Sequence, residues 1–257
     1  MPTVGHTSVH TEPNFEEYIV DKLVASKEWV ASKNSHGFDP VSALFMDDVI
    51  AYLENSNDSN RKFIEDKKKA PNWRENLEKL IVKQLENNGT IALLRDGFKE
   101  IGYGAIYLCG NVPIDRTIKE QQEMYDNNIL RVMRQCRYKD NGDDEIDLVF
   151  FINGIPVATA ELKTELCQTV EDAINQYKAD RKPIDPATNH KYPLLMPRRG
   201  AVVHFAISED EIWMCTDLDS RKNEPVFLPF NRGYFDEKGT FRPNKPVEKD
   251  DKDYPTE

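Results

Sequence analysis

The residues best suited to chemistry stand at the ends of two short β-type runs joined by a turn. Asp147 lies near the start of the first run, and Glu161 and Lys163 close the second. Asn153 and Gly154 mark the turn between the runs, which together predict a β-hairpin. Because side chains two positions apart on a strand share a face, Glu161 and Lys163 point the same way. The spacing therefore predicts a charged site on one face of the hairpin.

The register of the hairpin decides whether Asp147 joins this site. A two-residue loop over 153–154 places Asp147 opposite Ala160, whereas a three-residue loop over 153–155 places it opposite Glu161. Only the three-residue loop gathers both carboxylates and the amine on one face, and we predict that register. The opposite face then carries Leu148, Phe150 and Leu162.

Two carboxylates on one sheet face repel each other unless a cation lies between them. Mg²⁺ prefers oxygen ligands and keeps several waters, which leaves room for a phosphate group. The cation would polarise a phosphoryl oxygen and lower the pKa of a bound water, and Lys163 could stabilise the developing charge or orient that water. The pattern thus predicts metal-dependent phosphodiester hydrolysis. The alternative is a surface hairpin with an ion pair across it.

A helix predicted over 169–181 follows the hairpin. Thr169 with Asp172 three residues later is typical of a capping box. Gln176 lies beside the apolar face of this helix, where its amide could hydrogen-bond a phosphate or a metal-bound water, or remain solvated. The segment 176–204 holds six basic residues against two acids. Such an excess suits a phosphate track, or a solvated face.

Glu16 is the other acid with an unusual position. It lies three, four and seven residues before Ile19, Val20 and Leu23, so it shares the apolar stripe of the first predicted helix. Buried acids are rare without a partner. Glu16 therefore either joins the metal cluster or pairs with a lysine.

The elements that must position these residues change period along the chain. Helical spacing covers the segments from Asn14, 39–54 and 72–87, and 55–71 is either a loop or an exposed helix. Short β-type runs follow at 91–95, 105–109, 129–137, 146–152, 156–163, 200–207 and 211–216. This order predicts an α/β fold, with a mixed β-sheet flanked by helices and an N-terminal helical extension.

The expected organisation is one domain with two polar ends. Residues 1–13 are expected to be a flexible N-terminus. The domain spans 14–235, with a helical part over about 14–88 and a core over about 89–235. Residues 236–257 are polar and read as a tail or linker.

Composition narrows the function classes. The chain has 257 residues, and its 34 basic residues against 45 acids give a net charge of −11. This charge argues against a general nucleic-acid coat protein but permits a nuclease, because a bound cation and a local basic stripe can offset it. Neither the four cysteines nor the five histidines show the spacing of zinc ligands, which argues against a structural zinc site, and no run is long and apolar enough for a membrane span. A reducing cytoplasm is the expected location.

Several stretches resemble the N-terminal region of the restriction (R) subunit of type I restriction-modification enzymes. They are the hairpin 147–163, the following Gln168-Thr-Val-Glu-Asp-Ala-Ile-Asn-Gln-Tyr-Lys-Ala-Asp-Arg181, then Val203-His-Phe-Ala and Phe227-Leu-Pro-Phe-Asn-Arg-Gly233. Leu94-Arg-Asp-Gly-Phe-Lys99 and Phe15-Glu16 are similar to earlier landmarks of that family. The resemblance is strongest over about 90–235 and extends back to about residue 14.

The resemblance implies an endonuclease domain with a PD-(D/E)XK nuclease-like core that cuts double-stranded DNA with Mg²⁺. It implies Asp147, Glu161 and Glu16 as metal ligands and Lys163 as a catalytic residue. Gln176 corresponds to the glutamine of the family's Q-x-x-x-Y motif. DNA contacts are expected from Tyr177, Arg181 and Lys182. The implied partners, besides DNA, are the modification and specificity subunits of a type I complex.

The sequence departs from the family pattern in two places. Asp180 stands where the Q-x-x-x-Y motif has its tyrosine, and Tyr177 follows the glutamine directly. No G-x-x-x-x-G-K-[ST] motif occurs in the 257 residues. ATP use is therefore expected only from a translocase part outside this chain. Two alternatives remain open: a catalytically silent docking module for DNA or partner subunits, and a DNA-repair nuclease of the same fold.

Overall fold

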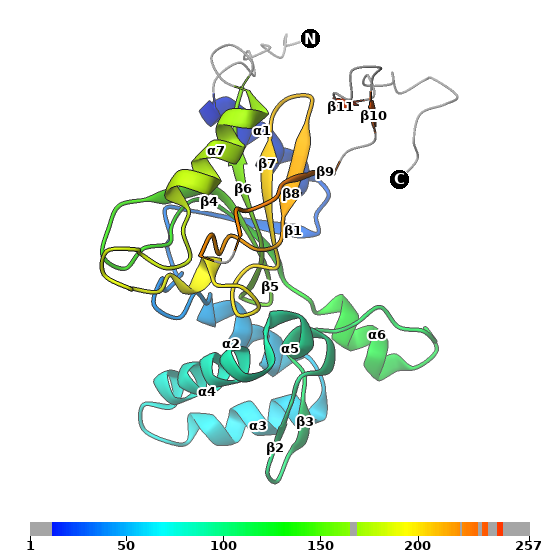
Figure 1. Cartoon of the computed structure of the whole chain (residues 1–257). Helices are drawn as coiled ribbons and strands as arrows, with labels where there is room; N and C mark the ends of the chain where they lie inside the picture. Colours follow the sequence, from blue (N-terminus) through cyan, green and yellow to red (C-terminus); the bar gives the residue numbers. More distant parts are fainter. Residues whose placement is uncertain (1–11, 165–168, 222, 231–232, 236–240, 244–257) are drawn as a thin grey trace.

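A computed structural model describes residues 12–164, 169–221, 223–230, 233–235 and 241–243 (Figure 1). Its centre is a seven-stranded mixed sheet flanked by helices, which confirms the predicted α/β class. In spatial order the strands are β1 (Trp29–Lys33), β4 (Leu130–Arg137), β5 (Glu145–Ile152), β6 (Ile155–Leu162), β7 (Val203–Ile207), β8 (Ile212–Cys215) and β9 (Leu228–Pro229). The β1–β4 and β6–β7 pairs are parallel, and the other neighbours are antiparallel.

Two helices cover opposite faces of this sheet. Helix α1 (Glu12–Ala25) packs Phe15 into a cluster with Leu148, whereas helix α7 (Val170–Asp180) packs Tyr177 into a cluster with Val149. Leu148 and Val149 are neighbours on β5, so their side chains point to opposite faces. Helix α7 also connects β6 to its parallel neighbour β7. The central hairpin thus lies between two helical layers.

A helical lobe is inserted between β1 and β4, and Figure 1 shows it below the sheet. We define it as α2 (Met46–Asn55), α3 (Asp58–Lys68), α4 (Trp73–Asn88), α5 (Thr90–Asp96), the hairpin of β2 (Phe98–Glu100) and β3 (Gly104–Ile106), and α6 (Lys119–Asp126). The N-terminal helix is confirmed, but most of the predicted helical part follows the first strand of the sheet. The sequence patterns missed β1, because its side chains are mostly exposed.

Three further expectations on elements were wrong or incomplete. The run 91–95 belongs to helix α5, not to a strand, because a short apolar run fits either element. The helix expected from residue 39 begins at Met46, after a turn closed by a bridge between Asp39 and Leu44. The segment 55–71 is largely helix α3 and not a loop.

The hairpin of β5 and β6 closes differently from the prediction, yet it reaches the predicted alignment. Its turn has two residues, Asn153 at φ +50° and Gly154 at φ +78°, which are the signs of a type I′ turn. A bulge at Val157 then shifts the register by one residue, so that Leu148 pairs with Ala160. Asp147 and Glu161 are the next residues along this pair of strands. Leu148, Phe150 and Leu162 pack together in the cluster beneath α1, which agrees with their predicted common face.

The hairpin turn also fixes the helical lobe to the sheet. The backbone N–H of Phe45, just before α2, donates to the carbonyl of Gly154 at 2.9 Å. The Asn153 side chain accepts from the Ile129 N–H at 2.6 Å and donates to the Leu108 carbonyl at 2.9 Å. Asn153 is almost fully buried, so these bonds satisfy a polar group inside the molecule.

The two ends of the chain lie mostly outside the described residues. Of the expected flexible N-terminus, only Glu12 and Pro13 are described, and both belong to α1. Of the polar tail, only β11 (Phe241–Pro243) is described, paired with β10 (Gly233–Phe235). The expected domain boundaries therefore stay a prediction. Among the described residues no helix is both long and apolar enough to cross a membrane.

Candidate metal centre on the central hairpin

Asp147 lies where the backbone of the sheet is irregular. The β4–β5 ladder pairs Arg134 with Leu148 and Cys136 with Ile146, but it skips the pair between them. The skipped residue of β4, Gln135, has φ +50°. Ile146 and Leu148 consequently pack into different core clusters although they are two residues apart. The strand thus bends at the acid, which re-aims side chains in the way that β-bulges near active sites do.

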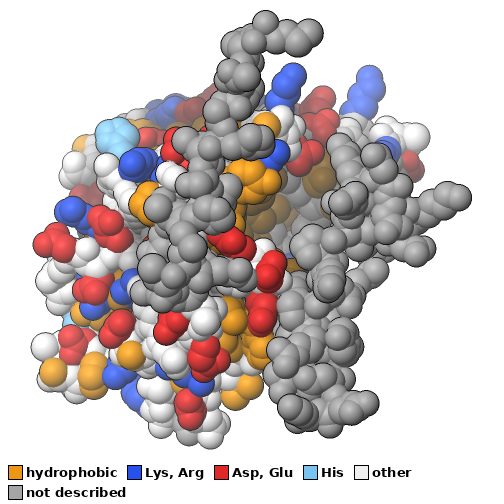
Figure 2. Space-filling view, turned by 90° about the horizontal axis from the view of Figure 1, so that it is seen from above, with side chains coloured by type: hydrophobic (Ala, Val, Ile, Leu, Met, Phe, Trp, Pro, Cys, Tyr) orange, Lys and Arg blue, Asp and Glu red, His pale blue; other side chains and the backbone are white. Residues whose placement is uncertain are grey.

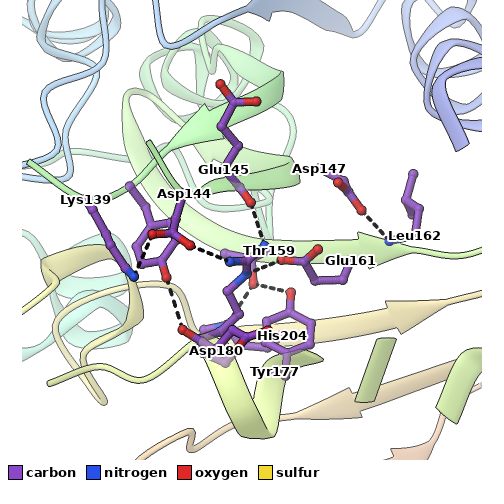
Figure 3. A network of polar contacts seen from close by, with 12 residues as sticks. Lys139, Asp144, Glu145, Asp147, Thr159, Glu161, Leu162, Tyr177, Asp180 and His204 are labelled. Carbon is purple, nitrogen blue, oxygen red and sulfur yellow. Dashed lines mark hydrogen bonds and ion pairs between the residues drawn. The ribbon is translucent and has the colours of Figure 1, made fainter. Parts of the chain in front are cut away.

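The Asp147 carboxylate is tied to the neighbouring strand. Its Oδ2 accepts a hydrogen bond from the backbone N–H of Leu162 at 2.7 Å (Figure 3). Asp147 is partly buried. This bond holds Asp147 beside the end of β6. Leu162, which donates the bond, directly follows Glu161 on that strand.

Glu161 is fully buried and only half satisfied. Its Oε1 accepts from Nε of Arg181 at 2.6 Å. Its Oε2 is buried and has no hydrogen-bond partner among the described residues. Buried carboxylate oxygens nearly always have a partner, because an unsatisfied charged group costs more than a neutral one. An orphaned oxygen of this kind is suited to a ligand that the protein itself does not supply.

The charges around Glu161 act in opposite directions. Burial, followed by the negative charge of Asp147, raises the pKa of Glu161 to about 8. The positive charges of Arg181 and Lys163 oppose this rise. Lys163 is itself 8% exposed, and its backbone N–H donates to the Ile207 carbonyl at 2.9 Å. The structure therefore brings Asp147, Glu161 and Lys163 into one electrostatic neighbourhood.

Glu16 approaches this neighbourhood from helix α1. It is 4% exposed, and its Oε2 accepts from Nε of Arg134 at 3.2 Å. Burial and then the charge of Asp147 raise the pKa of Glu16, against the opposing effects of Arg134 and Lys33. Of the two expectations for Glu16, the pairing is realised with an arginine. Its electrostatic coupling to Asp147 also keeps the role of a further ligand open.

The polar residues of helix α7, and the residues that follow it, differ in how far they are exposed. Gln176 is partly buried, Lys182 just beyond the helix is partly exposed, and Asp180 is exposed. Tyr177 and Arg181 are buried, so in this structure neither offers a surface to DNA. The expectation of DNA contacts is corrected for these two residues, since the helix turns both toward the sheet.

The buried side of α7 forms a polar network that the sequence patterns did not reveal (Figure 3). The Tyr177 hydroxyl bonds Thr159 Oγ1 at 2.8 Å, and Thr159 Oγ1 also bonds Nδ1 of His204 at 2.8 Å. Burial lowers the pKa of His204 to about 3, so the ring is neutral at pH 7. Only residue spacing could have pointed to this network. Thr159 lies two residues before Glu161, on the same strand face, and Tyr177 lies four residues before Arg181, on the same helix face.

The residues present fit a hydrated divalent cation. In the part of the chain that the structure describes, no group of three or more histidine, cysteine, aspartate or glutamate side chains is arranged to hold a metal. Mg²⁺, however, is commonly held by one or two carboxylates, with water completing its shell. Asp147 and the orphaned oxygen of Glu161 are such a pair, and Glu16 lies in electrostatic reach of it.

A comparison with known protein families gives a match over most of the chain. A family model described as the type I restriction enzyme R protein N terminus matches residues 42–223. The match includes the helical lobe, the hairpin and helix α7. No curated protein matches the chain.

Proposed function

The chain belongs to the family of type I restriction enzyme R protein N-termini, and from this premise we propose that it is a magnesium-dependent endonuclease domain that cleaves double-stranded DNA. The observation that carries the proposal is the buried Oε2 of Glu161, which has no partner among the described residues and lies near a second carboxylate. The hairpin pattern of Asp147, Glu161 and Lys163 supports assignment to the PD-(D/E)XK nucleases.

Asp147 and Glu161 would hold the cation, with Glu16 as a further ligand. When bound, Mg²⁺ supplies Lewis-acid activation of a phosphoryl oxygen and lowers the pKa of a bound water. Lys163 contributes a positive charge beside Glu161, which suits it to stabilise the negative charge that develops on the scissile phosphate. The amide of Gln176 is suited to orient a water or a phosphate oxygen. Lys182 remains the proposed DNA contact.

The charge of the molecule agrees with a need for cations. The chain carries −11 net charges, and Figure 2 shows carboxylates gathered beside hydrophobic side chains in the middle of one face. Such a surface repels the phosphate backbone unless cations and basic side chains offset it. We place the domain in the cytoplasm, in a complex with modification and specificity subunits. ATP would serve only a translocase part of that assembly.

Substitution within the complete restriction enzyme tests this function. Asp147→Asn, Glu161→Gln and Lys163→Ala should each lower DNA cleavage by about a hundredfold or more, since each removes a metal ligand or a catalytic charge. ATP-driven translocation should continue at the wild-type rate. As a control, Asp48→Asn removes a buried, ion-paired carboxylate of the helical lobe and should leave cleavage by the folded enzyme intact. Normal cleavage by all three hairpin variants would refute the proposal.

One observation favours a second function, a docking module without catalysis. Glu161 is already ion-paired with Arg181, and that pair can stabilise the hairpin without any metal. A docking module would bind DNA or partner subunits but show no divalent-cation binding that depends on Asp147 and Glu161. Calorimetric titration with Mg²⁺ or Mn²⁺ separates the two functions.

A further inference from the structure

Arg181 is anchored so firmly that it acts as a fixed positive charge beside Glu161. Besides its bond to Glu161, its Nη2 donates to the carbonyl of Glu145 at 2.7 Å. Its Nη1 lies 3.6 Å from Asp144, and its guanidinium lies 5.6 Å from the ring centre of Tyr138. Arg181 is 6% exposed. Glu145 begins β5, and Tyr138 and Asp144 lie in the connection between β4 and β5, so these contacts hold the guanidinium in place independently of Glu161.

This anchoring divides the two oxygens of Glu161 between different partners. Oε1 is taken by Nε at 2.6 Å, a short charge-assisted bond, whereas Oε2 has no partner among the described residues. In nucleases that use two metals the ions lie about 4 Å apart, so one carboxylate can bind a different ion with each of its oxygens. A second cation at Oε1 would have to displace a guanidinium that three other groups hold.

We propose that Arg181 is a positioning residue that takes the place of a second cation on Glu161, so that the site binds one divalent ion, through Oε2. The inference rests on the proposed metal-dependent function and adds the number of divalent ions that the site binds. It also assigns Arg181 an effect on the affinity of the site for that ion. A fixed positive charge near the site repels a divalent ion with twice the force that it exerts on a single charge. Arg181 therefore weakens cation binding while it orients the carboxylate.

Mn²⁺ binding to the whole chain, counted by electron paramagnetic resonance of the free ion at pH 8, tests the inference. The wild type should bind one Mn²⁺ that is lost in Glu161→Gln. Arg181→Gln should bind Mn²⁺ at least about fivefold more tightly, because a neighbouring positive charge is removed. Arg181→Lys keeps the positive charge, so its Kd for Mn²⁺ should stay within about threefold of the wild-type Kd. A purely structural arginine would give weaker binding in Arg181→Gln, not tighter binding.

A matched control is available in Arg131, which forms another buried ion pair, with Asp48, at 2.6 and 2.8 Å. Arg131→Gln should lower stability but leave the Mn²⁺ affinity within about twofold of the wild type, since it lies outside the site. Circular dichroism establishes that each variant is folded. If Arg181→Gln does not fold, the number of Mn²⁺ ions that the wild type binds still tests the inference.

The outcomes separate this inference from the proposed function. Two Glu161-dependent Mn²⁺ ions in the wild type, or unchanged or weaker binding by folded Arg181→Gln, would overturn the role of Arg181 alone. Identical Mn²⁺ binding by the wild type and Glu161→Gln would overturn both the metal site and the inference built on it.

Discussion

Among single residues, the charged triad could be predicted from the sequence, whereas its buried partners could not. Glu161 and Lys163 share a face because strand periodicity fixes residues two apart. Arg181 was expected to contact DNA, yet the structure buries it against Glu161. That contact depends on where α7 lies relative to β6, and local sequence carries no record of this. The same holds for the bond between Thr159 and His204.

His204 gives a prediction at this scale. Its pKa is about 3 in the folded protein because it is buried, against about 6.5 in an unfolded chain. Between these values the unfolded chain binds the extra proton, so the stabilising contribution is present above pH 6.5 and is lost as the pH falls. Relative to His204→Asn, the wild type should lose about 1.4 kcal/mol of unfolding free energy per pH unit between pH 6 and 4. Urea unfolding at several pH values measures this difference.

Asparagine is the matched substitution, because its amide can replace Nδ1 as the partner of Thr159 but does not titrate. Carboxylates titrate in the same pH range in both proteins, so their contribution cancels in the comparison. Parallel pH profiles for the two proteins would show that His204 is not held neutral by burial.

At the scale of strands and helices, the hairpin of β5 and β6 shows which part of the strand register follows from the sequence. The alignment of Leu148 with Ala160 follows from the pattern of apolar and charged residues. The loop length was wrong, because an Asn-Gly pair favours a two-residue type I′ turn and the alignment is restored later, at Val157. Pro156, beside the bulge, was the available signal, since proline within sheets is confined to edges, strand starts and bulges.

Gly154 gives a prediction for this turn. A Cβ added there would lie 2.1 Å from the carbonyl oxygen of Phe45, and φ is +78°. Gly154→Ala should therefore lower the unfolding free energy by about 3 kcal/mol or more, because turn and lobe must separate. Gly102 has a similar φ of +89° but nothing within 4 Å of an added Cβ. Gly102→Ala should cost only about 1 kcal/mol of backbone strain.

Both variants place alanine at a positive φ. The difference between their unfolding free energies, measured in urea, therefore reports the close contact between the turn and Phe45 alone. Equal losses in the two variants would mean that contact between the turn and the helical lobe contributes little to stability.

At the scale of the whole molecule, the sheet that carries the site joins two distant parts of the chain. The sheet begins with β1, and its parallel neighbour β4 follows only after the helical lobe, so that Trp29 pairs with Leu130. The composition and the alternation of periods sufficed for the α/β class. The insertion of the lobe could not be predicted, because pairing across such a separation depends on tertiary packing and not on local pattern. Both β-strands of the hairpin lie inside this sheet, which gives the carboxylates a rigid base.

The most direct measurement of the central claim is anomalous X-ray diffraction from crystals of the protein soaked with Mn²⁺. We predict one anomalous peak about 2.2 Å from Oε2 of Glu161, with Asp147 also in its coordination shell and Arg181 still bonded to Oε1. A protein that binds Mn²⁺ elsewhere, with Oε2 of Glu161 left without a cation, would contradict the assignment of this hairpin as a metal-dependent nuclease site.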